Sequence, residues 1–220
     1  MTVLFVVLTF ILFVLVDILV LKAHKKKLSE LNLPPIAVFS LKNLLHPEKF
    51  YISPGHTWVQ ILQDGLVKIG IDDFVLKAFG KLSIINISGE STIVKKGDIV
   101  FQGAFDGKSV SFRSPVDGVV KFVNKEIVGN IVDDPYNESW GLIISPTKLE
   151  ENLQSIKSGN ELTKWLKNEF VRLKDFLSVN MANVGLAGVT MHDGGNIIEG
   201  AVAKMNDKGV QNFEKEFLTF

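Results

Sequence analysis

Seven short runs of alternating or β-branched residues occupy the middle of the chain, between residues 51 and 146. Each run is bounded by Gly, Pro, Asp or Asn, which favour turns. This pattern predicts a small all-β sandwich or barrel. Between two of the runs, residues 72–80 predict one short helix that ends at Gly80. The seven runs cover residues 58–64, 66–71, 81–87, 98–105, 108–114, 118–124 and 140–146.

The N-terminal segment has a different character. Residues 2–20 are an apolar run with Asp17 as its single charge, long enough at 1.5 Å per residue to cross a ~30 Å hydrocarbon core. A cleaved signal peptide is the alternative, but no basic segment precedes the run and no small-residue cleavage site follows it. We therefore expect a retained transmembrane anchor over residues 1–22, with residues 2–20 in the lipid bilayer.

Four lysines follow this run, whereas only the terminal amine precedes it. They are Lys22, Lys25, Lys26 and Lys27. The positive-inside rule then predicts a single-pass protein of the cytoplasmic (inner) membrane with its C-terminal domain in the cytoplasm. Asp17 is either hydrated near the interface or in contact with a partner helix. Residues 23–50 are expected to be a basic juxtamembrane linker, with a short helix around Leu41–Leu45.

The pattern becomes helical after Pro146, and residues 147–220 are expected to form a mainly helical extension. Thr147 and Glu150 have the spacing of a capping box, which predicts a helix near 147–157. The further expected elements are a helix at 160–178, a turn at Asp193-Gly194-Gly195, an alternating run at 196–204 and an amphipathic helix around 210–218.

Composition excludes several kinds of site. The chain has no cysteine, which rules out disulfides, thiolate zinc sites and thiol nucleophiles. Its four histidines are widely separated, and the 24 basic residues balance the 24 acidic ones. We therefore expect no metal, no nucleic acid partner and no catalytic residues, and we expect that the chain is not an enzyme.

A series of short motifs, in order, carries a family resemblance. It begins with His56-Thr57-Trp58 and continues through Gly70-Ile71-Asp72-Asp73 and Lys96-Gly97-Asp98. It ends with Ser114-Pro115-Val116-Asp117-Gly118 and Asp134-Pro135-Tyr136. Residues 51–146 thus resemble the glycine cleavage system H protein family, whose lipoyl/biotinyl-type domain is a mainly β barrel-sandwich hybrid. The resemblance implies largely structural roles for His56 and Trp58.

The resemblance also implies a lipoyl group on a lysine in a tight hairpin, eight residues before the proline of the Pro-Val-x-Gly turn. Here that position is Gly107, and the acidic residue and serine ahead of it are replaced by Ala104 and Phe105. Asp106-Gly107 predicts a two-residue hairpin turn. Lys108 is then displaced beside the tip, because a shift of one residue moves a side chain to the opposite face of a strand. Lys108 is the single candidate for lipoyl attachment.

Two functions follow as hypotheses. The first is a membrane-anchored H-like protein that lacks the lipoyl lysine and therefore carries no cofactor. It would serve as an accessory or scaffold subunit of a membrane complex, and a redox complex is one candidate. The second is a lipoyl carrier that uses Lys108 for aminomethyl or electron transfer. Trp165, Phe170 and Phe176 in the extension could pack on the barrel or on a partner subunit.

Overall fold

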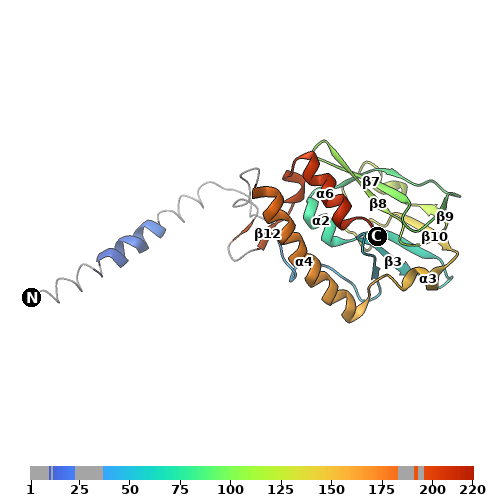
Figure 1. Cartoon of the computed structure of the whole chain (residues 1–220), viewed down its shortest axis with the longest axis horizontal. Helices are drawn as coiled ribbons and strands as arrows, with labels where there is room; N and C mark the ends of the chain where they lie inside the picture. The colour runs from blue at the N-terminus through green and yellow to red at the C-terminus, as the bar shows by residue number, and fades with distance from the viewer. Residues whose placement is uncertain (1–9, 11, 23–36, 183–190, 193–195) are drawn as a thin grey trace, which may run out of the picture. The chain divides into compact units, whose positions relative to one another are not determined.

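The structure is a computed structural model that describes residue 10 and residues 12–22, 37–182, 191–192 and 196–220. It divides into two units, residues 1–36 and 37–220. In the first unit, residues 12–22 are helical and exposed, as the blue coil in Figure 1 shows. Within the described part of the chain, no helix has both the length and the apolar character needed to cross a membrane. The expected span at 2–20 lies partly outside the described residues.

The described residues of the second unit form three antiparallel sheets. The largest has the order β2 (Tyr51–Ile52), β3 (Thr57–Ile61), β4 (Val67–Ile71), β10 (Leu142–Pro146), β9 (Gly118–Val123) and β6 (Ile93–Val94). The second consists of β5 (Ser83–Ile87), β7 (Ile99–Phe105) and β8 (Lys108–Arg113). The third joins β1 (Val38–Phe39), β12 (Asn196–Ile198) and β11 (Met191–His192). Each of the seven predicted runs overlaps one strand, so the mainly β prediction is confirmed.

Alternation of side chains directs these strands into a shared core. In β8, Val110 and Phe112 are buried, whereas Ser109 is exposed and Ser111 is half-buried. In β7 the same period buries Phe101, Gly103 and Phe105. Because buried and less buried side chains alternate along these strands, one face of the second sheet lies against the core. The other face is left to solvent or to a covering element.

The predicted short helix is α2 (Asp73–Phe79). Asp72 begins it, because its carboxylate accepts a hydrogen bond from the backbone N–H of Val75 at 3.1 Å. Gly80 ends it with a φ of 76°, in the left-handed region where glycine is favoured. Five of the seven residues of α2 are buried apolar side chains, so the helix packs between the sheets and the C-terminal extension.

The extension contains α3 (Leu149–Leu153), α4 (Gly159–Ala182), β11, β12, the short 3₁₀ helix η2 (Val202–Lys204) and α6 (Asp207–Phe217). The predicted helices at 160–178 and 210–218 correspond to α4 and α6. The predicted capping box is wrong: Lys148 is the N-cap of α3, and no side chain caps that end. The expected turn at Asp193-Gly194-Gly195 lies outside the described residues.

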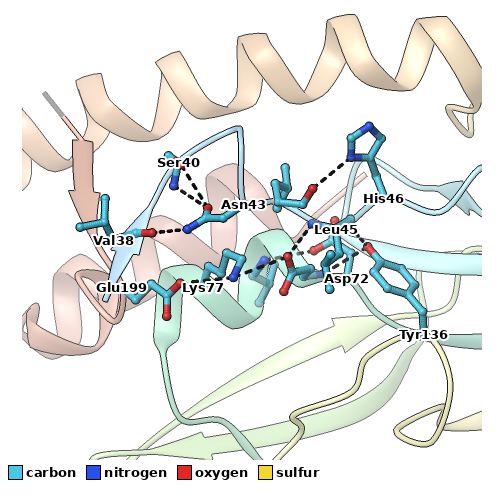
Figure 2. Close-up of polar contacts among 12 residues, drawn as sticks. Val38, Ser40, Asn43, Leu45, His46, Asp72, Lys77, Tyr136 and Glu199 are labelled. Atoms are coloured by element: carbon cyan, nitrogen blue, oxygen red, sulfur yellow. Dashed lines mark hydrogen bonds and ion pairs between the residues drawn. The ribbon is translucent and has the colours of Figure 1, made fainter. Parts of the chain in front are cut away.

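The helix expected around Leu41–Leu45 does not form. The side-chain amide of Asn43 instead donates to the carbonyl of Val38 and closes a tight turn (Figure 2). The backbone N–H of Leu45 donates to Asp73 at 2.8 Å, and the Tyr136 hydroxyl donates to the Leu45 carbonyl at 2.9 Å. These tertiary hydrogen bonds fix the segment in an extended path over the start of α2.

Candidate functional site

The β7–β8 hairpin holds the position at which the family resemblance places its lipoyl lysine. Phe105 pairs with Lys108, so Asp106 and Gly107 are the two turn residues, as the sequence predicts. Their φ angles are 43° and 74°, and two positive φ values are the requirement of a type I′ hairpin turn. Both turn residues are exposed. A Cβ added to Gly107 would meet no atom within 4 Å, so the tip projects into open space.

Lys108 lies beside this tip, as the first residue of β8, and is half-buried. Its Nζ donates to the carbonyl oxygen of Ala203 in η2 at 3.3 Å. A second contact follows along the strand, where the backbone N–H of Ser111 donates to the Glu214 carboxylate at 3.2 Å. Thus η2 and α6 cover one side of the hairpin, and in Figure 1 α6 runs beside β8.

Aromatic side chains join the same elements beneath the surface. Phe105, at the end of β7, is buried, and its ring centroid lies 4.4 Å from that of Phe79 in α2. Phe79 in turn meets Phe213 of α6 edge-on at 5.2 Å. Phe105 is the residue at which the resemblance places the family's serine ahead of the hairpin tip. Its apolar side chain therefore packs against α2, and α6 covers α2 at this point.

A second polar cluster lies inside the second unit, around His56. The imidazole is fully buried, and its Nδ1 lies 2.7 Å from Asp72 Oδ2. Its Nε2 faces Glu169 Oε2 of α4 at 3.9 Å, too long for a hydrogen bond. The ring stacks on Phe74 with centroids 4.5 Å apart, and Trp165 lies 5.1 Å away.

The charges in this cluster set the protonation state of His56. Burial alone would lower the pKa of the imidazole, but Asp72 and Glu169 outweigh burial and raise the pKa to about 9. His56 is therefore an imidazolium at neutral pH. Its positive charge lies between Asp72, in the loop before α2, and Glu169, in α4. Its backbone φ of 58° is in the left-handed region, so the surrounding contacts hold a strained conformation.

Comparison with known proteins decides the family. The family model for the glycine cleavage H-protein matches residues 50–169. A probable glycine cleavage system H protein of Pyrococcus furiosus is 36% identical over 124 residues, which cover 54% of this chain and 91% of the relative. The chain belongs to the glycine cleavage H-protein family.

Other H proteins give similar matches. The glycine cleavage system H protein of Coprothermobacter proteolyticus is 28% identical over 117 residues, covering 52% of this chain and 91% of the relative. The crystal structure of a glycine cleavage system H protein from Mycobacterium marinum is 24% identical, covers 46% of this chain and 87% of its own, and has a TM-score of 0.43. The family match ends at residue 169, so Ala203 and α6 lie beyond it.

The H-protein family normally carries lipoate, and the hairpin can be tested for its fit to that group. Attachment needs a side-chain amine, and Gly107, the residue at which the resemblance places the family's lysine, has none. Lys108 offers the amine nearest the tip, but this amine is half-buried and already donates to Ala203. The matched position therefore does not fit lipoate, and Lys108 fits it only when its contact with Ala203 is broken.

The remaining motif residues lie where a structural role requires. Trp58 is fully buried and its Nε1 donates to the carbonyls of Ile71 and Pro135, both at 3.0 Å. Tyr136 is buried against Phe50 and hydrogen bonded to Leu45. Within the described residues, no group of three or more His, Asp and Glu side chains is placed to hold a metal ion.

Neither the residues that cover the hairpin nor those that bind the extension belong to a motif that the sequence reveals. Ala203 and Glu214 are ordinary residues without a motif, and Glu169 is one of several charges on an amphipathic helix. Only the burial of Glu169 distinguishes it, because it lies on the inner face of α4 between Leu166 and Leu173. That position could have indicated a buried charge in need of a partner.

Proposed function

We propose that this H-protein relative acts as an accessory or scaffold subunit of a membrane complex and not as a lipoyl carrier. One observation carries the proposal: the exposed hairpin tip has Gly107, without a side chain, where the family places its lysine. A second supports it, because the neighbouring Lys108 is turned toward Ala203 of the extension. In this role the hairpin contributes to folding and not to group transfer.

The membrane part of the proposal rests on the sequence. Residues 2–20 are apolar, and four lysines follow them. The described residues between 12 and 22 are helical, and their large apolar side chains are exposed. A lipid bilayer would remove these side chains from water. We propose that this segment anchors the chain in the cytoplasmic membrane, with residues 37–220 in the cytoplasm.

Protease protection tests the topology. Protease added outside intact spheroplasts should leave the domain at 37–220 undigested, and permeabilised spheroplasts serve as the control. Digestion of the domain in intact spheroplasts would contradict the proposed orientation.

Co-purification tests the scaffold role. Tagged wild-type chain and the Lys108→Ala variant are recovered from detergent-solubilised membranes, and the co-purifying subunits are quantified. A scaffold should retain the same stoichiometric subunits with both chains, because Lys108 has only a local contact. Loss of these subunits from Lys108→Ala alone would contradict the scaffold role.

The alternative function is a lipoyl carrier that uses Lys108 for aminomethyl or electron transfer. Membership of the H-protein family favours it, as does the position of the amine one residue from the tip. Lipoate bound there as an amide would supply a dithiolane on a flexible arm, and tethering raises its effective concentration at partner enzymes. In either role the chemistry belongs to the cofactor or the partner subunits, so we propose that the chain itself is not an enzyme.

A further inference from the structure

The outward face of α4 carries three lysines around an exposed apolar side chain. Val171, near the middle of the helix, is 56% exposed. Lys164 and Lys167 precede it by seven and four residues, and Lys174 follows it by three, spacings that return to the same face of a helix. Asp175, also exposed, follows Val171 by four residues, so three positive charges lie near one negative charge. We call Val171 and these three lysines the α4 basic patch.

The charges of this patch are not neutralised within the fold. Among the described residues, no carboxylate lies within ion-pair distance of Lys164, Lys167 or Lys174. Arg172 of the same helix differs, because its guanidinium pairs with Glu169 at 3.1 Å. The lysines of the patch are therefore available to an anionic partner outside the chain.

The start of the second unit is fixed against the same helix. Phe39 of β1 lies two residues after the unit begins, and its ring meets that of Phe170 in α4 at 5.1 Å. The chain then continues along α4 to His46, which lines one cavity together with Asn160 (Figure 2). The point at which the preceding linker enters the unit is therefore beside α4.

The linker to the apolar N-terminal run is short. Lys22 and Ala37 are 15 positions apart in the sequence. A fully extended chain covers at most about 3.6 Å per residue, so the linker reaches no farther than about 50 Å. When residues 2–20 anchor the chain, this tether keeps α4 at a high effective concentration beside the bilayer surface.

We propose that the α4 basic patch docks on the anionic phospholipid headgroups of the bilayer that holds the anchor. The lysines supply the attraction, because the cytoplasmic leaflet has a negative surface potential. Val171 lies among them and meets the boundary between headgroups and acyl chains. Docking gives the second unit one orientation, with α4 toward the lipid and β9, on the opposite side of the unit in Figure 1, toward the cytoplasm. This inference rests on the proposed function only in taking residues 2–20 as the anchor.

Quenching of a single fluorescent label tests the docking in the full chain. The chain has no cysteine, so Val171→Cys provides one thiol for the label. The labelled chain is reconstituted into vesicles of phosphatidylcholine, with or without phosphatidylglycerol, that contain a nitroxide on some headgroups. The label at position 171 should be quenched strongly on the anionic vesicles and weakly on the neutral ones. Phe122→Cys, at a position 55% exposed on β9, is the matched control and should be quenched weakly on both.

Removal of charge tests the role of the lysines. Lys164→Gln and Lys167→Gln together should lower the ratio of docked to undocked chain about 30-fold, because each lysine near an anionic surface contributes a factor of about five. Lys208→Gln and Lys215→Gln remove two exposed lysines of α6 and should leave the quenching unchanged. At about 1 M salt the Debye length falls to about 3 Å, so salt should abolish the strong quenching while the anchor stays in the bilayer.

Equal quenching at position 171 on neutral and anionic vesicles would overturn the docking, and so would equal losses from the α4 and α6 pairs of variants. A partner subunit on this face would give quenching that does not depend on lipid charge, which also overturns it. Flotation of the chain with neutral vesicles measures the anchor separately. Failure to float contradicts the anchor, whereas flotation without charge-dependent quenching contradicts the docking alone. Neither measurement depends on lipoylation.

Discussion

The Nζ of Lys108 lies 3.3 Å from the carbonyl oxygen of Ala203, across a sequence separation of 95 residues. This bond links the hairpin of the H-protein fold to a segment that the family model does not match. The amine nearest the hairpin tip is thereby bound within the chain.

Replacement of Lys108 should have a small effect on stability. Lys108→Ala removes one half-buried hydrogen bond to a backbone carbonyl, so we expect a loss of no more than about 1 kcal/mol in the free energy of unfolding. Urea denaturation of the two chains measures it. A loss of several kcal/mol would show that Lys108 is a major stabilising contact between the hairpin and η2.

Replacement of Phe170 should strongly reduce the stability of the fold. Its side chain is buried, and its ring meets Phe39 of β1 at 5.1 Å, so Phe170→Ala opens a cavity under α4. We expect a loss of about 3–5 kcal/mol in the free energy of unfolding.

Trp165→Ala should lower the free energy of unfolding by less, because Trp165 is only half-buried. Val171→Ala on the exposed face of the same helix is the control and should change stability by less than about 0.5 kcal/mol. Equal effects of Phe170→Ala and Val171→Ala would contradict the packing of α4.

Stability should depend on pH through His56. Its pKa in the folded chain, about 9, is above the ordinary value of 6.5, so protonation stabilises the fold. This contribution is fully present below pH 6.5 and is lost as the pH rises through 9. The groups that face the imidazole are Asp72 from the loop before α2 and Glu169 from α4, with Arg172 beyond Glu169.

Urea denaturation between pH 6 and 10 measures this dependence. The free energy of unfolding of the wild type should fall between pH 6.5 and 9, and that of His56→Asn should lack this fall. Asn is chosen because it tolerates the left-handed φ of 58° better than most residues. The same fall in both chains would assign the pH dependence to other groups.

Two glycines with similar backbone angles should respond differently to alanine. Gly80 and Gly107 have φ values of 76° and 74°, so alanine is strained at both. A Cβ at Gly80 would lie 3.1 Å from the Cα of Gly200, whereas a Cβ at Gly107 meets nothing within 4 Å. Thermal denaturation should show Gly80→Ala to be the more destabilising by at least about 1 kcal/mol. Equal losses would remove the evidence for close contact between α2 and the extension.

The β-sheets were predictable because strand period and turn residues are local signals. Asp106-Gly107 is such a local turn signal, and both residues have the positive φ values that this turn requires. The segment around Leu41–Leu45 was mispredicted because Asp73 and Tyr136, distant in sequence, satisfy its backbone groups. The capping box at Thr147 failed for a similar reason, since the Thr147 N–H donates to the Asp117 carbonyl.

The covering of the hairpin could not be predicted from the sequence. It depends on where α6 packs, and the apolar period of a helix shows which face is buried but not against what. Glu214 and Ala203 reach the hairpin only because α4 and α2 position α6 and η2. The family resemblance identified Gly107 and Lys108 as the positions to compare, and the fold then placed the Lys108 amine against Ala203.

The mass of the chain isolated from its native source tests most directly whether the hairpin is lipoylated. The intact protein and the proteolytic peptide that contains Lys108 are both measured, and a Lys108→Arg chain from the same source is the control. The scaffold role predicts the mass of the unmodified chain in both cases. A wild-type mass increased by one lipoyl amide on Lys108, absent from Lys108→Arg, would contradict the scaffold role and establish the carrier.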